Sequence, residues 1–338
     1  MSYPKRDLLA DVSRYSGITQ ALMALPRKPV LLVLNYHRVG EPSKTLYDAE
    51  VYSVTPPEFD AQIAFWKRRF RIVTLAEAID LIERPAGHNQ TAVLITFDDG
   101  YLDNFELAFP ILASHGAQGV FFLPTAFVGT NRIPWWDAMA FIIRNTRKPK
   151  FRLPGFSDEF ELSGGNINRV IARVLNVYRS TAQCDSESFI SRLEEACDSA
   201  RPGPAHRCFL NWDEARSMLQ GGMAIGSHTH SHEILSRLSD VEQVRELETS
   251  RSLLQEHLGG PVDSLSYPVG LPDSFSTYTQ TAARNAGYRI AFSFYGGLNR
   301  PGSIDPYNVL RHGAVFGQSM GRYQLQTTVA AVTGKYWF

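Results

Sequence analysis

Two adjacent carboxylates, Asp98 and Asp99, follow a run of apolar, β-prone residues that ends at Phe97. Gly100 comes next and allows the backbone to turn away from the end of that strand. Two neighbouring negative charges cost free energy unless a cation neutralises them or one of them holds a proton. The pattern therefore predicts either a polar turn, for which Asp-Gly is a common signal, or a site that binds a cation.

Two histidines, His228 and His232, follow a second apolar segment at 223–227 and are four residues apart. Side chains at positions i and i+4 share one face of a helical turn, so both imidazoles could bind one metal ion. This spacing alone is a weak signal. Joined to a carboxylate at a strand end, however, the histidines complete a set of two nitrogen ligands and one oxygen ligand, with coordination positions left for water.

Apolar segments of strand length alternate with segments of helical pattern along most of the chain, which predicts a parallel sheet or a β/α barrel. The predicted strands are 29–35, 71–75, 92–97, 119–123, 223–227, 264–267, 288–293 and 308–311. Polar side chains recur where these strands end. In a β/α barrel such positions meet on the C-terminal rim, where active sites lie.

The alternation stops at about 130–210, where Pro134 leads a helix to Arg144 and two or three more helices follow, so we expect a helical insertion there. Residues 5–25 predict an amphipathic helix that either braces the fold or lies against a membrane surface. No strongly basic face accompanies its apolar positions, which favours bracing. Those apolar positions are Leu8, Leu9, Val12, Tyr15, Ile18, Leu22 and Met23.

Composition narrows the function classes. The chain has 338 residues and a formal net charge of zero, so nothing in the charge balance indicates a nucleic-acid partner. No apolar run approaches the ~20 residues of a membrane-spanning helix. Asp7, Asp11 and Arg14 interrupt the N-terminal segment, which does not read as a secretory signal, so we expect a cytoplasmic protein. The oligomeric state stays open.

Three motifs carry a resemblance to a known family: Thr-Phe-Asp-Asp-Gly at 96–100, Ser-His-Thr-His-Ser-His at 227–232 and Tyr-Pro-Val-Gly at 267–270. The sequence resembles the polysaccharide deacetylase family, the NodB-homology domain of carbohydrate esterase family 4. Further segments resemble members from exopolysaccharide gene clusters, namely 36–39, 121–124, 134–137 and 298–302. The resemblance covers about 28–315, leaving a helical extension at 1–27 and a C-terminal tail at 316–338.

The resemblance implies a distorted (β/α)7 barrel and a metal-dependent hydrolysis of acetyl groups on sugars. Asp98 would be the general base, and Asp99, His228 and His232 would bind a divalent metal. That metal would be Zn²⁺, with Co, Ni or Mn as alternatives, and it would lower the pKa of water and polarise the acetyl carbonyl. The backbone N–H of Val269 would help to hold the oxyanion.

The sequence departs from the family pattern in two places. Ser266 stands where the third motif has an Arg that orients the base, and Arg311 or Arg38 could replace that Arg. The segment around His312 is only a near match to the motif that supplies the general acid. His37, at the tip of the first strand, is a second candidate for that acid or for a substrate contact.

We therefore expect a hydrolase that removes acetyl groups from the N-acetylated sugars of a polysaccharide or its precursor, in exopolysaccharide biosynthesis. Tyr36, Val269 and Arg311 are the expected oxyanion and substrate contacts. The alternatives are a related hydrolase of other C–N amide bonds, such as a deformylase or cyclic amidase, and a catalytically silent saccharide-binding homologue. The intact Asp98 argues against silence, because binding alone needs no base.

Overall fold

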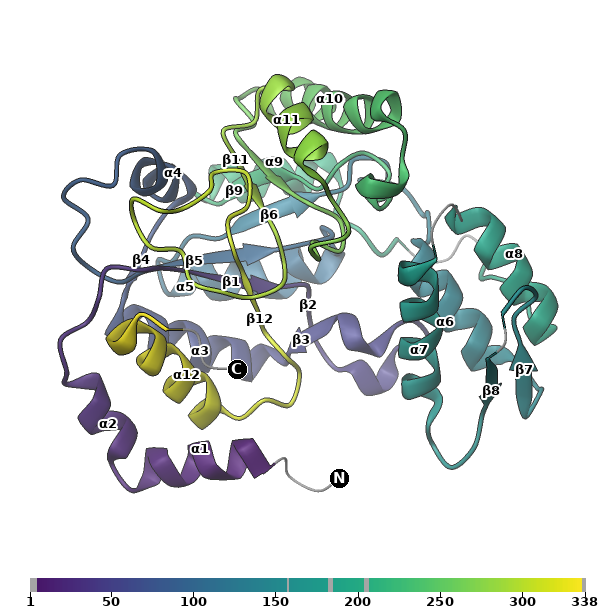
Figure 1. The fold of residues 1–338 in the computed structure, drawn as a ribbon, viewed down its shortest axis with the longest axis horizontal. Helices are drawn as coiled ribbons and strands as arrows, with labels where there is room; N and C mark the ends of the chain where they lie inside the picture. The colour runs from purple at the N-terminus through teal and green to yellow at the C-terminus, as the bar shows by residue number, and fades with distance from the viewer. Residues whose placement is uncertain (1–4, 157, 182–184, 204–206, 336–338) are drawn as a thin grey trace.

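Seven short parallel strands form a barrel at the centre of the molecule, which a computed structural model describes for residues 5–156, 158–181, 185–203 and 207–335 (Figure 1). Six of them follow one another around the sheet in chain order. They are β1 (Leu31–Tyr36), β5 (Ala92–Phe97), β6 (Val120–Leu123), β9 (Ala224–Ser227), β10 (Ser264–Ser266) and β11 (Ile290–Phe292). The first seven predicted strands are confirmed, with ends that differ by up to about three residues. The eighth, predicted at 308–311, contributes only a bridge at Val309, and the strand itself lies just after it, at His312–Gly313.

The last strand, β12 (His312–Gly313), closes the barrel. It pairs with β1, where Leu34 is level with His312. Just before it, Val309 bridges to Phe292 at the end of β11, so one segment joins the two edges of the sheet. The expected (β/α)7 arrangement is therefore confirmed, and the closing segment is the one that contains Arg311.

Minor strands add to this frame. β4 (Arg71–Ile72) pairs with the beginning of β5. Next to β1, β2 (Arg38–Val39) pairs with β3 (Tyr52–Val54) in a separate two-stranded sheet.

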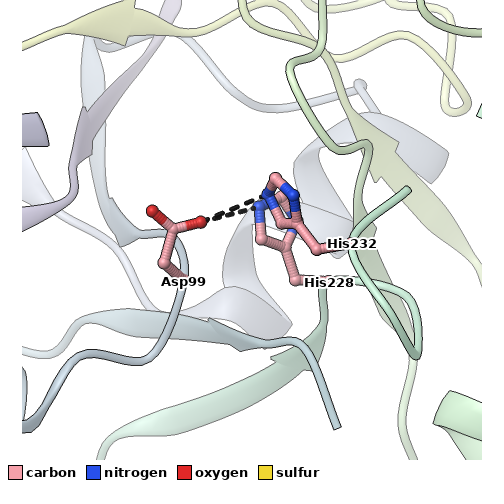
Figure 2. A group of neighbouring side chains, drawn as sticks. All are labelled: Asp99, His228 and His232. Carbon is pink, nitrogen blue, oxygen red and sulfur yellow. Dashed lines mark ion pairs between the residues drawn. The ribbon is translucent and has the colours of Figure 1, made fainter. Parts of the chain in front are cut away.

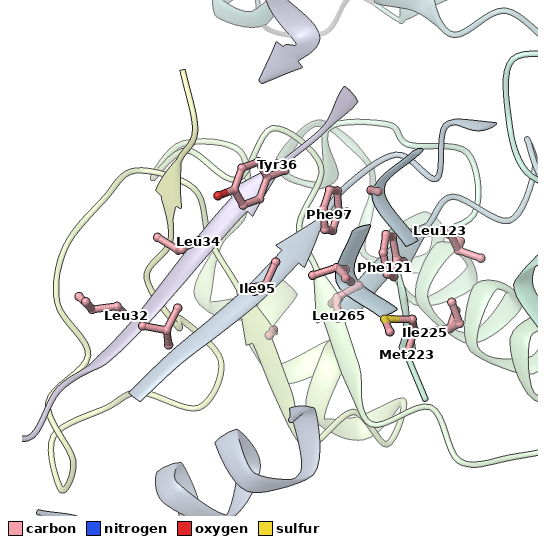
Figure 3. Close-up of a cluster of buried hydrophobic side chains, with 14 of the residues drawn as sticks. Leu32, Leu34, Tyr36, Ile95, Phe97, Phe121, Leu123, Met223, Ile225 and Leu265 are labelled. Carbon is pink, nitrogen blue, oxygen red and sulfur yellow. The ribbon is translucent and has the colours of Figure 1, made fainter. Parts of the chain in front are cut away.

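Side chains along each strand alternate between the outer and inner faces of the barrel wall. The outer-face cluster in Figure 3 includes Leu32, Leu34, Tyr36, Ile95, Phe97, Phe121, Leu123, Ile225 and Leu265. The intervening residues form a second cluster inside the barrel together with α4 (Leu75–Glu83). That cluster includes Leu31, Val33, Leu94, Phe122, Phe292 and Val309. This alternation decides which polar residues beyond the strands face the site.

Helices cover the outer face of the barrel (Figure 1). They are α3 (Pro56–Arg69), α5 (Phe109–Ser114), α9 (Trp212–Gln220), α10 (Asp240–Leu258) and α11 (Thr277–Asn285). A π-helical turn at Asn104–Ala108 precedes α5. Capping boxes at Thr55 and Ser239 begin α3 and α10.

The insertion is built around a second hydrophobic cluster, and its helices lie together to one side of the barrel (Figure 1). Its helices are α6 (Trp135–Asn145), α7 (Ile167–Ser180) and α8 (Ser186–Cys197). An antiparallel pair that the sequence did not predict, β7 (Lys150–Arg152) with β8 (Glu159–Glu161), extends it.

The N-terminal segment differs from its prediction. It forms two helices, α1 (Lys5–Tyr15) and α2 (Ile18–Met23), because Gly17 turns the chain at a φ of 83°. Five residues of the expected apolar face, Leu8, Leu9, Val12, Tyr15 and Ile18, are exposed, whereas Met23 at its end packs against the core. Asp7 is buried instead.

The segment expected to be a C-terminal tail forms α12 (Met320–Thr333), which packs against α1 and α2 (Figure 1). Its N-terminus explains why Asp7 is buried. The Asp7 carboxylate accepts the Ser319 amide at 3.0 Å and lies 3.5 Å from Arg322. Among the described residues, no helix is both long and apolar enough to cross a membrane.

Candidate active site

A pocket of about 200 Å³ lies on the C-terminal rim of the barrel, beneath the insertion. Asp98 and Asp99 reach it directly after β5, and His228 and His232 reach it after β9. Trp135, Trp136 and Phe294 supply much of its apolar wall. The strand-end positions that the sequence predicted to share one rim do meet there.

Asp99 and the two histidines converge on one point (Figure 2). The Asp99 Oδ1 atom lies 3.4 Å from Nε2 of His228 and 3.3 Å from Nε2 of His232. All three side chains are buried. Nδ1 of His228 is hydrogen bonded to the Ser266 carbonyl oxygen at 2.8 Å, which leaves its Nε2 facing Asp99.

These spacings fit a tetrahedral cation. Ligand atoms that are ~2.0–2.2 Å from a tetrahedral ion lie roughly 3.3–3.6 Å from one another. Two imidazole nitrogens and one carboxylate oxygen also match the donor types that Zn²⁺ prefers, with a position left for water or substrate. The residues present therefore fit the divalent metal that the resemblance implied.

Left-handed backbone positions cluster around this set. Asp99, Thr229 and His232 have φ angles of 71°, 64° and 59°. Such conformations are uncommon outside glycine, cost free energy and concentrate at functional sites. At Asp99 the turn redirects a side chain that a regular strand would point away from its neighbour, so both carboxylates of the Asp98–Asp99 pair reach the pocket.

Arg311 holds Asp98 in place. Its guanidinium donates from Nη1 to Oδ1 at 2.8 Å and from Nη2 to Oδ2 at 2.7 Å, a bidentate pair. It also donates to Asn35 at 2.7 Å and to Ser266 at 2.8 Å. Asn35 itself donates to Asp98 at 3.1 Å, so the carboxylate is enclosed by donors.

This network decides the charge of Asp98. Burial by itself would raise the pKa of the carboxyl group, but the Arg311 guanidinium, together with His228 and His37, outweighs burial and holds the pKa at about 2. Burial also acts to raise the pKa of Asp99, and hydrogen bonds from His228 and His232 bring it below its ordinary value. Both carboxylates are therefore ionised at neutral pH.

His37 and Val269 complete the polar wall of the pocket. His37 Nε2 lies 4.0 Å from Asp98 Oδ2. Val269 has a φ of 64°, a rare conformation for a β-branched residue, in a turn closed by the Gly270 amide bound to the Pro268 carbonyl at 2.7 Å. Within the part of the chain that the structure describes, the Val269 amide makes no hydrogen bond, so its N–H is available to donate one to a ligand.

Three sequence candidates lie elsewhere. Tyr36 points to the outer face, where its hydroxyl donates to Gln62 at 2.7 Å, so it cannot contact substrate in the pocket. His312 also points outward and lines a separate cavity of about 350 Å³ under α12. Arg38 pairs with Asp103 at 2.8 Å and therefore does not replace the missing Arg.

The alternation of side chains along a strand explains why Tyr36 and His312 point away from the pocket. Tyr36 follows Asn35, and His312 follows Arg311. Asn35 and Arg311 face the interior, so the next residue in each strand must face outward. Burial also lowers the pKa of His312 to about 4, which keeps that imidazole neutral at physiological pH.

Two residues outside the predicted site set, Asn35 and Ser266, accept hydrogen bonds from Arg311. The sequence marked Ser266 only as the residue in place of the family arginine. Trp136 packs against His232, with ring centroids 4.4 Å apart. Arg179, from the last turn of α7, also lines the pocket, and no motif indicated it.

Comparisons with known proteins agree with this geometry. YxkH of Bacillus subtilis (strain 168), whose name places it among the polysaccharide deacetylases, is 20% identical over 281 residues, covering 83% of this chain and 70% of that protein. The Streptococcus pyogenes deacetylase PplD, solved with acetate, is 17% identical at a TM-score of 0.57 and covers 90% of this chain and 98% of its own.

A de-N-acetylase from Aggregatibacter actinomycetemcomitans is 17% identical at a TM-score of 0.55, covering 88% of this chain and 99% of its own. At these identities, the two solved structures establish a shared fold. The sequence profile of the family described as polysaccharide deacetylase matches residues 86–291, more than half of the chain. This chain therefore belongs to the polysaccharide deacetylase family.

Proposed function

We propose that this protein is a metal-dependent hydrolase that removes acetyl groups from the N-acetylated sugars of a polysaccharide or its precursor. The observation that carries the proposal is the position of Asp98 beside the Asp99, His228 and His232 set. One carboxylate is available as a cation ligand, and its neighbour is held ionised for proton transfer. Family membership and the N-deacetylating relative support the choice of an N-acetyl group.

The residues of the chain divide the reaction between them. A divalent metal held by Asp99, His228 and His232, for which we propose Zn²⁺, would supply a Lewis acid that polarises the acetyl carbonyl and acidifies water. Asp98 takes a proton as water attacks the carbonyl carbon. Arg311 acts through Asp98 as a positioning residue, since its guanidinium fixes the orientation of that carboxylate.

The opposite wall completes the reaction. The Val269 amide donates to the oxyanion as the carbonyl carbon becomes tetrahedral. His37 gives a proton to the leaving amine as the C–N bond breaks, which releases acetate and a free amino sugar. Both residues line the same pocket as Asp98. Removal of acetyl groups from an exopolysaccharide is one setting for this activity.

A panel of substrates tests the proposal. The Zn²⁺-loaded chain should release acetate from N-acetylglucosamine oligomers, as measured by an enzyme-coupled acetate assay. N-formylated sugars and cyclic amides in the same panel test the related amidases. Metal retention without hydrolysis of any member would identify a saccharide-binding homologue instead and refute the proposal.

A pair of neighbouring variants tests the roles of the two carboxylates. Asp98→Asn should keep its metal and lose acetate release by ~10²-fold or more. Asp99→Asn should lose its metal. Metal content by mass spectrometry and the far-UV circular dichroism of both variants separate these effects from misfolding. Full turnover in Asp98→Asn would show that the base has been misassigned.

A further inference from the structure

We propose that the pocket contains a subsite for an anionic group, a carboxylate or phosphate carried by the saccharide, and that Arg179 binds it. This inference rests on the proposed function, because it names the substrate class of the same site. It concerns the insertion rather than the barrel, since Arg179 belongs to the last turn of α7 and lines the pocket that contains Asp98 and Asp99.

The position of Arg179 is fixed by its neighbours. Tyr178, one residue earlier, is fully buried, with its ring centroid 4.7 Å from Trp135 and 5.2 Å from Phe189. The Arg237 side chain donates to the carbonyl oxygen of Tyr178 at 2.8 Å and also to that of Arg179. The backbone at the end of α7 is therefore anchored, and Arg179 extends from a rigid support.

Among the residues that the structure describes, the guanidinium of Arg179 forms no ion pair. Within residues 5–156, 158–181, 185–203 and 207–335, no carboxylate oxygen lies within 4.0 Å of it, and it donates no hydrogen bond. Its guanidinium carbon lies 5.8 Å from the ring centroid of Trp135. By contrast, the nearby guanidinium groups of Arg38 and Arg311 are bound to Asp103 and Asp98.

The acidic groups around Arg179 act only at longer range. Asp48 and Glu50 are the nearest on the adjoining loop, and Asp99 lies across the pocket. The Asp48 carboxylate already accepts the Glu50 amide at 3.0 Å. These groups favour the charged form of Arg179, yet they leave its five N–H donors available to a ligand.

The charge balance of the pocket then favours an anion. Arg311 neutralises Asp98 through the bidentate pair. A divalent cation would more than offset the single charge of Asp99. Arg179, whose exposed side chain borders the pocket, adds a further positive charge to its lining.

The geometry of guanidinium selects the chemical class. Its planar fork matches the paired oxygens of a carboxylate or a phosphate, while the hydroxyl groups of a neutral sugar offer no such pairing. A uronic acid residue and a sugar phosphate would both provide this anion. A saccharide that combines an N-acetyl group with either one carries both groups that the residues of this pocket would bind.

Equilibrium binding to matched probes tests the subsite independently of turnover. One pair compares oligomers of alternating N-acetylglucosamine and glucuronic acid with N-acetylglucosamine oligomers of equal length. A second pair compares N-acetylglucosamine 1-phosphate with N-acetylglucosamine. Dissociation constants are measured by isothermal calorimetry on the Zn²⁺-loaded full chain, at low and at high NaCl concentration. The two pairs distinguish a carboxylate from a phosphate.

We expect at least one anionic probe to bind ~10-fold tighter than its neutral counterpart, with a preference that shrinks at high salt. Arg179→Gln should raise the dissociation constant of the anionic probe ~10- to 100-fold and change that of the neutral probe by no more than about 2-fold. Arg179→Lys should be intermediate, because an ammonium cannot form the bidentate pair. Arg173→Gln, an exposed arginine on the same helix, is the matched control and should change nothing.

Equal affinity for charged and neutral probes in the wild-type chain, including no measurable binding of either, overturns the subsite. An anionic affinity that survives Arg179→Gln does the same. Acetate release from the same probes is scored separately. A charge preference without acetate release refutes the proposed hydrolase and keeps the subsite, whereas acetate release without a charge preference refutes the subsite alone.

Discussion

Arg311 and Asp98 are 213 positions apart in the chain and form two hydrogen bonds of 2.8 and 2.7 Å inside the barrel. Asp98 follows β5, and Arg311 precedes β12, the strand that closes the sheet against β1. Closure of the barrel therefore brings the cation to the carboxylate. Ser266, which occupies the position of the expected family arginine, accepts a hydrogen bond from the same guanidinium.

Arg311→Lys should raise the pKa of Asp98 and reduce turnover, because a lysine cannot supply the bidentate pair or bind Asn35 and Ser266 at once. We expect kcat to fall ~10- to 100-fold and the acid limb of the pH–rate profile to move to higher pH. Arg38→Lys, which affects the pair with Asp103, is the control. An unshifted acid limb in Arg311→Lys would remove Arg311 from its positioning role.

The two candidate acids can be separated by a pair of histidine variants. His37 lines the pocket, and His312 lines the cavity under α12. His37→Asn should lower kcat by ~10²-fold, since the leaving amine loses its proton donor. His312→Asn should leave kcat within about 2-fold. Steady-state kinetics on an N-acetylated oligomer decides between them, and a larger loss in His312→Asn would contradict the assignment of His37.

The alternation of side chains along a strand can be read from the sequence. It would have placed Tyr36 and His312 on the outer face of the barrel. In β1, the buried apolar residues Leu31 and Val33 face inward, so Asn35 and His37 share their side and Tyr36 does not. The closing segment follows the same rule, with Val309 and Arg311 inside. A prediction from residue type and strand position alone could not separate Arg311 from its neighbour His312.

Other features had no signal in the sequence. Hydrophobic pattern and motif spacing predicted the barrel, the rim and a set of His228, His232 and one carboxylate, and the family resemblance assigned that carboxylate to Asp99. Arg179 reaches the pocket through the packing of α7 within the insertion, which depends on contacts between segments far apart in the chain. The outward apolar face of α1 arises because Asp7 is bound to Ser319, a pairing that no local pattern indicates.

Metal removal should destabilise the protein, because a ligand that binds only the folded state adds to its stability. A chelator such as EDTA should lower the melting temperature, and a metal concentration ~1,000 times its Kd should add about 4 kcal/mol to the free energy of unfolding. His232→Ala should abolish this response. His230→Ala is the matched control, since its Nδ1 is hydrogen bonded to Thr125 at 2.8 Å and lies outside the ligand set.

Differential scanning fluorimetry with and without Zn²⁺ measures both histidine variants. A Zn²⁺-dependent shift that persists in His232→Ala would mean that the metal is held elsewhere. Loss of the shift in His230→Ala would instead widen the ligand set beyond the three residues that converge in Figure 2.

Asp137, buried beneath the pocket in α6, should make folding stability depend on pH. It accepts hydrogen bonds from the Tyr101 hydroxyl at 3.0 Å and from the Asp48 amide at 3.1 Å, yet burial raises its pKa to about 7. Its folded form binds a proton more tightly than the unfolded form. Its contribution to the free energy of unfolding is therefore largest at low pH and falls as pH rises towards 7.

Asp137→Asn removes this titration. Between pH 5 and pH 8 we expect the free energy of unfolding of the wild-type chain to fall by on the order of 1–3 kcal/mol relative to that of the variant. Urea unfolding at each pH measures this difference. Glu195→Gln, an exposed carboxylate on the same insertion, should leave the pH dependence unchanged. Parallel pH profiles for Asp137→Asn and the wild type would show that Asp137 is ionised throughout this range and that Arg38 outweighs its burial.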